Sequence, residues 1–255
     1  MADFDSSGVR INYIDEGSGP AVVLVHGFAS NLQGNWRAPG VVDALVRSGR
    51  RVVALDCRGH GRSDKPHDPE AYGGTIMADD VIALMDHLGI RQADLAGYSM
   101  GGMLSASLLA RHPERLRSVI LAGVGDAVVR GRPTGNREAI AQAMEAPEGT
   151  RSDNATARGF RAFAERSGND LEALAAIQRS TRGGYDATKL AETRLPVMVL
   201  VGEDDALVGS AEPLAAYIPG AKLVKVPGDH LAAVGQPQFR DAIVAFFNEK
   251  SPVAA

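Results

Sequence analysis

Short runs of apolar residues alternate with amphipathic segments along most of the chain. Residues 75–89 have helical spacing, with Ile76, Leu84 and Leu88 on one face. Residues 9–17 alternate between apolar and polar positions, which predicts a half-exposed antiparallel strand at the edge of a sheet. Nearly continuous apolar strands separated by helices predict a parallel sheet covered on both faces. Six runs predict its strands: residues 21–27, 50–56, 92–98, 116–123, 196–202 and 221–228.

A long segment after the fourth of these runs breaks the alternation. It contains no strand-like run, only helix-prone stretches such as residues 137–146 and 171–180, separated by Gly, Pro, Asn and Asp. We therefore predict an α/β fold with a mostly parallel central sheet. Residues 1–125 and 192–255 form its core, and residues 126–191 form an inserted helical cap, or lid.

The composition restricts the class of protein. The chain has 255 residues, of which 45% are hydrophobic, and a net charge of −4. No block of Lys and Arg stands out, so we expect no nucleic-acid partner. The single cysteine, Cys57, cannot form an internal disulfide. No signal-peptide pattern and no run of about 20 apolar residues is present, so we expect a cytoplasmic protein without a membrane partner. A homo-oligomer is compatible with this composition.

A serine lies between two glycines in the segment GYSMG, residues 97–101. The segment follows an apolar run and precedes small residues. Gly-x-Ser-x-Gly at a junction of strand and helix places the serine in a strained turn, with its Oγ above the sheet. Ser99 is therefore a candidate nucleophile. The alternative is a tight turn with a solvent-exposed serine.

One of the six histidines, His230, follows the last predicted strand and precedes the final helix. This position lies at the carboxyl edge of the sheet, where open α/β folds bind their ligands. A neutral imidazole there could accept the proton of Ser99. The alternative is a histidine that starts a helix. His26 looks catalytic in isolation, but its place before a turn indicates a structural hydrogen bond.

An acid must orient this imidazole, and Glu203, Asp204 and Asp205 follow one of the predicted strands. We favour Asp205 over Asp204, and Asp126 competes for the same role. The order Ser99, Asp205, His230 is the chain order of an α/β-hydrolase.

If Ser99 attacks a carbonyl group, the reaction also needs an oxyanion hole, formed by two backbone N–H groups that point to the carbonyl oxygen. Met100 would donate one from the start of its helix. Phe28 would donate the other from the turn after residues 21–27.

The chain resembles the α/β-hydrolase fold family over nearly all of its non-inserted part. In that family the acid falls three residues after the glycine at position 202, which favours Asp205. Asp56, Arg58 and Ser63 are expected to brace their loop. The resemblance rests on five motifs in the expected order: VHGF (25–28), DCRGHGRSDKP (56–66), GYSMGG (97–102), VGEDDALV (201–208) and GDH (228–230).

The resemblance also bears on the reaction. Related epoxide hydrolases and haloalkane dehalogenases carry Asp where this chain has Ser99, which cannot form their alkyl-carboxylate ester. A serine implies an acyl-enzyme and hydrolysis of a small carboxylic ester or lactone. Carbon–carbon-bond hydrolases and perhydrolase-like esterases share that triad, and a catalytically idle ligand-binding protein is an alternative of another class. No metal-ligand or nucleotide-binding spacing occurs, so we expect no cofactor and no metal.

The insert is expected to select the acyl group. Met144, Phe160, Phe163 and Tyr185 are candidates for an apolar substrate pocket, and the alternative is that they pack the insert onto the core. Its arginines could bind a carboxylate or lie on solvated helix faces: Arg130, Arg132, Arg137, Arg158 and Arg161.

Overall fold

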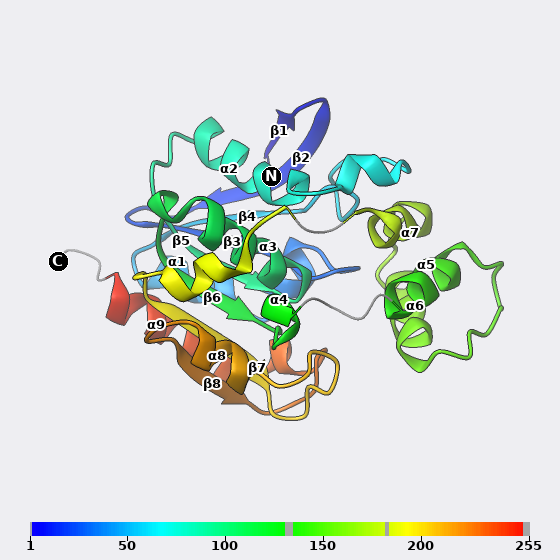
Figure 1. The fold of residues 1–255 in the computed structure, drawn as a ribbon. Helices are drawn as coiled ribbons and strands as arrows, with labels where there is room; N and C mark the ends of the chain where they lie inside the picture. Colours follow the sequence, from blue (N-terminus) through cyan, green and yellow to red (C-terminus); the bar gives the residue numbers. More distant parts are fainter. Residues whose placement is uncertain (1, 131–134, 182–183, 252–255) are drawn as a thin grey trace.

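The computed structural model describes residues 2–130, 135–181 and 184–251 (Figure 1). Within them, an eight-stranded sheet has the order β1-β2-β4-β3-β5-β6-β7-β8. Neighbours from β4 to β8 are parallel, whereas β1 and β2 are antiparallel to their neighbours. The predicted α/β fold is confirmed. The strands are β1 (Ala2–Ser6), β2 (Val9–Glu16), β3 (Ala21–Val25), β4 (Arg51–Leu55), β5 (Ala93–Tyr98), β6 (Leu116–Ala122), β7 (Val197–Gly202) and β8 (Lys222–Val226).

The antiparallel strand predicted for residues 9–17 is present as β2, but the prediction that it lies at the edge of the sheet is wrong. β2 pairs with β4 on one side and with β1 on the other, so β1 is the edge of the sheet. The sequence of β1 is short and polar, and its first two residues are exposed. An edge strand buries little surface, so its sequence carries only a weak hydrophobic pattern.

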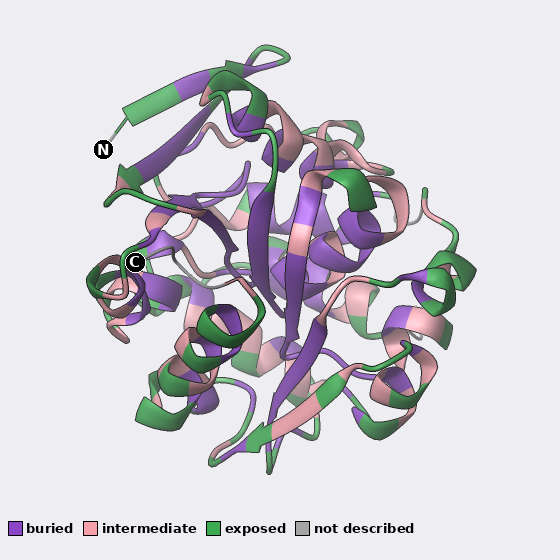
Figure 2. Cartoon of the chain, turned by 90° about the vertical axis from the view of Figure 1, so that its left-hand side faces the viewer, coloured by how far each residue is buried: buried purple, intermediate pink, exposed green. Residues whose placement is uncertain are grey.

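Helices cover both faces of the sheet because successive strand residues point to opposite sides. Val22 and Leu24 pack on the face that α1 (Val41–Arg47) and α9 (Pro237–Lys250) cover. Val23 packs in the second core, on the opposite face. The helices of that face are α2 (Ile76–His87), α3 (Met100–Arg111) and α8 (Glu212–Tyr217). Figure 2 shows buried central strands and helices whose outer faces are exposed.

The chain between β6 and β7 forms helices only, within the described residues. Asn154 and Asp170 accept hydrogen bonds from main-chain N–H groups and so cap the N-termini of α6 and α7. Figure 1 shows α5, α6 and α7 grouped to one side of the sheet. No described helix is both long and apolar enough to cross a membrane. The inserted helices are α4 (Ala127–Arg130), α5 (Gly135–Glu145), α6 (Ala155–Arg166) and α7 (Leu171–Arg179).

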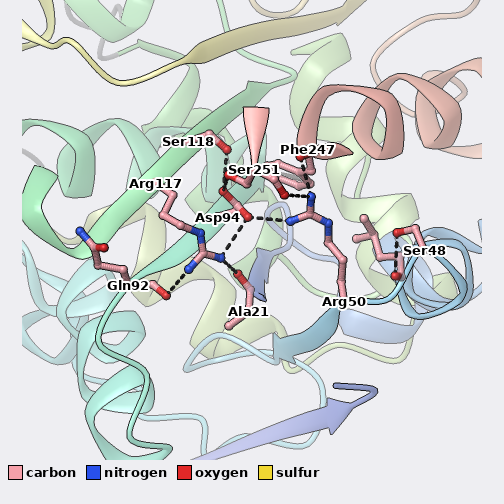
Figure 3. A network of polar contacts seen from close by, with 10 residues as sticks. Ala21, Ser48, Arg50, Gln92, Asp94, Arg117, Ser118, Phe247 and Ser251 are labelled. Carbon is pink, nitrogen blue, oxygen red and sulfur yellow. Dashed lines mark hydrogen bonds and ion pairs between the residues drawn. The ribbon is translucent and has the colours of Figure 1, made fainter. Parts of the chain in front are cut away.

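A buried cluster of charges joins the starts of the central strands to the end of α9 (Figure 3). Asp94, at the start of β5, accepts hydrogen bonds from Arg50 at 2.8 Å and from Arg117 at 3.0 Å. Its second oxygen accepts from the hydroxyls of Ser118 and Ser251, both at 2.8 Å. The side chains of Arg50 and Asp94 are both 0% exposed. The cluster therefore holds strands and a terminal helix together at a point that water does not reach.

Removal of the Asp94 charge should destabilise the fold strongly. We expect Asp94→Asn to lower the free energy of unfolding by about 3–5 kcal/mol, because the buried guanidinium of Arg50 loses its counter-charge. Urea unfolding measures this change. The control is Asp15→Asn, which breaks the more exposed ion pair of Asp15 with Arg51 and should cost less than about 1 kcal/mol. Equal losses in the two variants would contradict the prediction.

Candidate active site

Ser99 lies in a strained turn between the end of β5 and the start of α3. Its φ of 52° and ψ of −107° lie outside the usual regions for a residue with a side chain. Such a conformation costs on the order of 1–3 kcal/mol, so the surroundings must hold it. The N–H of Ser99 donates to the carbonyl of Ala122 at 2.8 Å, and its carbonyl accepts from the N–H of Met103 at 3.0 Å.

Two glycines beside Ser99 allow backbones to approach more closely than a Cβ would permit. A Cβ on Gly97 would lie 2.0 Å from the carbonyl oxygen of Gly101. A Cβ on Gly101 would lie 2.1 Å from the carbonyl oxygen of Val25, at the end of β3. The Gly-x-Ser-x-Gly pattern therefore follows from packing of α3 against β3 and β5.

The structure brings Ser99, His230 and Asp205 into one hydrogen-bonded series. His230 Nε2 lies 2.9 Å from Ser99 Oγ, and His230 Nδ1 lies 2.7 Å from Asp205 Oδ2. A carboxylate accepts the proton of Nδ1, so Nε2 is left to accept the hydroxyl proton of Ser99. All three residues are buried, at 6–7% exposure. The hydroxyl of Tyr98 donates to the main-chain carbonyl of His230 and fixes the loop.

The competing acids lie elsewhere. Asp204 is exposed to solvent, and Asp126 lies 3.5 Å from Arg130 in an ion pair at the start of the insert. His230 is also farther from the last helix than the sequence suggested. α9 begins at Pro237, and a short 3₁₀ turn at Ala233–Gly235 lies between them.

In the loop after β3, the N–H groups on either side of Phe28 are hydrogen-bonded. The N–H of Gly27 donates to Asn35 Oδ1 at 2.9 Å, and the N–H of Ala29 donates to His60 Nε2 at 3.1 Å. Within the described chain, no hydrogen bond engages the N–H of Phe28 between them. Met100 is the first residue of α3, so its N–H lacks an intrahelical acceptor. Asn35 was not singled out from the sequence, although it closely follows VHGF.

Two buried histidines hold this loop without carrying charge. His26 Nε2 accepts from the N–H of Cys57 at 2.9 Å, and its Nδ1 donates to the carbonyl of Gly27 at 2.8 Å. His60 accepts from Ala29 and donates to the carbonyl of Arg58 at 3.1 Å. Burial lowers the pKa of both imidazoles, that of His60 to about 3. The structural hydrogen bond expected of His26 is present.

The loop of residues 56–66 is braced by the residues expected to do so. Asp56 accepts the N–H of Leu32 at 2.8 Å. Ser63 donates to the carbonyl of Asp56 at 2.6 Å, and Arg58 forms a two-point ion pair with the buried Asp80. Asp80 lies on the predicted apolar face of α2, and this ion pair explains its burial.

Two cavities formed by described residues flank Ser99. We call the larger, of about 360 Å³, the Gln178 cavity, and the smaller, of about 190 Å³, the His230 cavity. Phe28 and Phe160 line both, and their rings meet edge to face with centroids 5.5 Å apart. Beside Ser99, Phe28 and Phe160, the Gln178 cavity is lined by Met100, Asp126, Ala127, Arg130, Asn136, Arg137, Ile140, Thr156, Gln178, Leu207, Val208 and Gly209. The His230 cavity is lined further by Gly27, Ser30, Asn31, Gly34, Asn35, Tyr98, Phe163, Ser167, His230, Leu231 and Val234.

The four residues predicted to line an apolar substrate pocket lie in different parts of the structure. Phe160 and Phe163 line the His230 cavity. Met144 lines neither cavity beside Ser99. It is 2% exposed in the core because α5 turns this side chain inward. Tyr185 lines a separate cavity of about 70 Å³ and donates to the carbonyl of Val128 at 3.2 Å.

The arginines of the insert also lie in different places, some at the cavity and some away from it. Arg130 and Arg137 line the Gln178 cavity. Arg158 and Arg161 donate to main-chain carbonyls that precede α6, and Arg132 lies outside the described residues. No cluster of three or more His, Cys, Asp or Glu able to hold a metal ion is found in the described chain.

Comparison with known proteins identifies relatives. Residues 20–236 match the profile of a family described as the alpha/beta hydrolase fold. The chain is 38% identical over 112 residues to bifunctional epoxide hydrolase 2 of Sus scrofa. It is 38% identical over 120 residues to 2-hydroxymuconate semialdehyde hydrolase of Pseudomonas sp. strain CF600. A solved thermophilic esterase from Thermogutta terrifontis superposes with a TM-score of 0.76 at 28% identity, covering 97% of this chain and 96% of the other.

The curated relatives match only part of each protein. The alignments cover 44% of this chain and 20% of the pig protein, and 46% of this chain and 41% of the Pseudomonas protein.

A histidine outside the site links the core to the insert. His67 Nε2 lies 3.1 Å from Asp170 Oδ2, and His67 Nδ1 lies 2.9 Å from Glu172 Oε2, both at the start of α7. The hydrogen bond to Asp170 raises the pKa of His67 above its ordinary value of 6.5. The protonated imidazole therefore favours the folded state. This stabilisation is complete below about pH 6.5 and is lost as the pH rises through the higher pKa of the folded protein.

The contribution of His67 to stability should accordingly depend on pH. We expect His67→Ala to lower the urea midpoint at about pH 5.5 and to have a smaller effect at about pH 9, where less of the imidazole is protonated. Unfolding curves of the variant and the wild type at the two pH values test this. The same difference at both pH values would show that the charge of His67 is not involved.

Proposed function

We propose that this chain, which belongs to the α/β-hydrolase fold family, is a serine hydrolase. Its proposed reaction is the cleavage of a small carboxylic ester or lactone. The observation that carries the proposal is the buried series from Asp205 through His230 to Ser99, with distances of 2.7 Å and 2.9 Å. A base within hydrogen-bond reach activates a serine hydroxyl that is otherwise a weak nucleophile.

In this mechanism Ser99 Oγ attacks the carbonyl carbon while His230 Nε2 takes the hydroxyl proton. Asp205 stabilises the imidazolium that forms. The tetrahedral intermediate collapses when His230 donates its proton to the leaving oxygen, which breaks the ester bond. Water then attacks acyl-Ser99 with His230 again as the base, and the acid is released.

The carbonyl oxygen of the substrate becomes negatively charged in the tetrahedral intermediate. It must then be stabilised by nearby hydrogen-bond donors. The N–H groups of Phe28 and Met100 are the proposed donors. A single such donor typically contributes about 10²–10³-fold to the rate. Because the loop is held on both sides of Phe28, its N–H group needs little reorganisation during the reaction.

The two cavities suggest where each half of the substrate binds. His230 must protonate the leaving oxygen, so we assign the leaving group to the His230 cavity. The acyl group stays on Ser99 beside the Met100 N–H, so we assign it to the Gln178 cavity, which Met100 also lines.

A carbon–carbon-bond hydrolase is the second candidate, favoured by the identity with the Pseudomonas semialdehyde hydrolase. Epoxide opening, the activity named for the pig relative, is disfavoured for this chain. A serine alkoxide that opens an epoxide forms an ether, which water cannot cleave as it cleaves an ester.

The nucleophile can be tested directly. Ser99→Ala should abolish labelling by a fluorophosphonate probe and lower the hydrolysis of p-nitrophenyl acetate by about 10⁴-fold or more. In-gel fluorescence and the release of p-nitrophenol measure the two effects. Labelling that survives the substitution would refute the assignment of Ser99, and a wild-type protein that is not labelled would favour a ligand-binding role.

The acid can be tested with a matched pair of neighbours. Asp205→Asn should reduce kcat by on the order of 10⁴-fold, because the imidazole loses the partner that fixes its tautomer. Asp204→Asn should leave kcat close to that of the wild type, since Asp204 is exposed. Equal losses in the two variants would shift the role to Asp126.

A further inference from the structure

Gln178 is a polar residue on the otherwise apolar buried face of α7. It is 7% exposed, it lines the Gln178 cavity, and no hydrogen bond of its side chain is found among the described residues. The rest of α7 that faces inward is apolar, with Leu174 and Ile177 in the core. The amide atoms of Gln178 are not among the buried side-chain atoms that lack a partner, so they are open to the cavity and can be solvated there. The amide is therefore available to hydrogen-bond a ligand group that enters the cavity.

The surroundings of Gln178 favour an anion as that group. Arg137 donates to the main-chain carbonyls of Ile177 and Ser180, near the C-terminus of α7. These bonds hold the guanidinium at the C-terminal turn of α7, and Arg137 and Gln178 line the same cavity. The cavity is also lined by Arg130, whose charge is partly offset by Asp126 at 3.5 Å.

Gln178 and Ser99 line the same cavity, which is large enough to hold a short acyl chain between them. Near Ser99 the lining is apolar, with Phe28, Met100 and Phe160. The cavity thus offers apolar contacts to the first carbons of an acyl group and polar contacts to its end.

We propose that Gln178 selects acyl groups that end in a carboxylate, so that the preferred substrates are mono-esters of short dicarboxylic acids. This inference rests on the proposed serine hydrolase activity. The amide N–H₂ of Gln178 donates to the carboxylate, and the charge of Arg137 lowers the cost of removing that carboxylate from water. An acyl group with an apolar end would displace water from the amide without replacing its hydrogen bonds, and would bind less well.

The test compares pairs of methyl esters that differ only at the end of the acyl chain. Monomethyl glutarate and monomethyl adipate are each paired with the neutral methyl ester in which an isopropyl group replaces the carboxylate. Acid release in a pH-stat gives kcat/KM for each ester. We expect the wild type to prefer the carboxylate by about tenfold or more. A preference for the isopropyl end, or for a primary amide at that end, would overturn the proposal.

Variants at position 178 then assign the preference to this side chain. Gln178→Leu should reduce the ratio of carboxylate to isopropyl ester by about tenfold to a hundredfold. Gln178→Glu should reduce it further by repulsion. The ratio is measured within one variant, so a general loss of activity cancels. Gln142→Leu, on the exposed face of α5, is the matched control and should not change it. An unchanged ratio in Gln178→Leu would refute the role of Gln178.

A binding measurement separates this inference from the proposed activity. Adipate has no ester bond, so calorimetric titration tests the cavity without catalysis. Binding that is about tenfold weaker in Gln178→Leu than in the wild type supports the inference even if Ser99 is not labelled. Equal binding, or none, overturns it even if Ser99 is labelled and p-nitrophenyl acetate is hydrolysed.

Discussion

The close approach of α3 to the ends of β3 and β5 is the constraint on which the site depends. Gly101 meets the carbonyl of Val25 at a distance that no other residue could tolerate. This contact fixes the first turn of α3 against the loop after β3, and Ser99 adopts its positive φ between them. The proposed nucleophile and its proposed oxyanion donors therefore owe their spacing to backbone packing and need no flexible side chain to set it.

The loop that contains Phe28 is held from two sides. His26 and His60 support it from the core through buried hydrogen bonds, and burial lowers the pKa of both imidazoles. Asn169, between α6 and α7, donates to the carbonyl of Ala29 at 2.8 Å. Ala29 itself has a φ of 59°, an unusual value for a residue with a Cβ. The insert thus contacts the same strained loop that the core supports, and the position of one is linked to the position of the other.

Local patterns, together with the family resemblance, predicted most of the fold and the three side chains that the structure brings into contact, with Asp204 and Asp126 left as alternatives for the acid. The six parallel strands follow from apolar runs, and the contacts among Ser99, His230 and Asp205 follow from their places after strands whose carboxyl ends meet at one edge. Residues whose environment depends on distant segments could not be assigned. β1 has the polar sequence of an edge strand. A glutamine in an amphipathic helix, such as Gln178, is typical of a solvent-exposed position. Met144 is apolar in either environment, so its sequence context could not distinguish the core from a cavity.

Phe160 has a consequence for how selectivity can change in this protein. Its ring meets that of Phe28 and forms part of the wall of both cavities beside Ser99. A larger or smaller side chain at this position would shrink or enlarge both cavities together. With the proposed assignment of the two cavities, mutants selected for a bulkier acyl group would then also accept bulkier leaving groups, and laboratory evolution of one preference would carry the other with it. To change the selectivity of one cavity without the other, substitutions would have to be made at residues that line only one of them. Examples are Ile140 in the Gln178 cavity and Val234 in the His230 cavity.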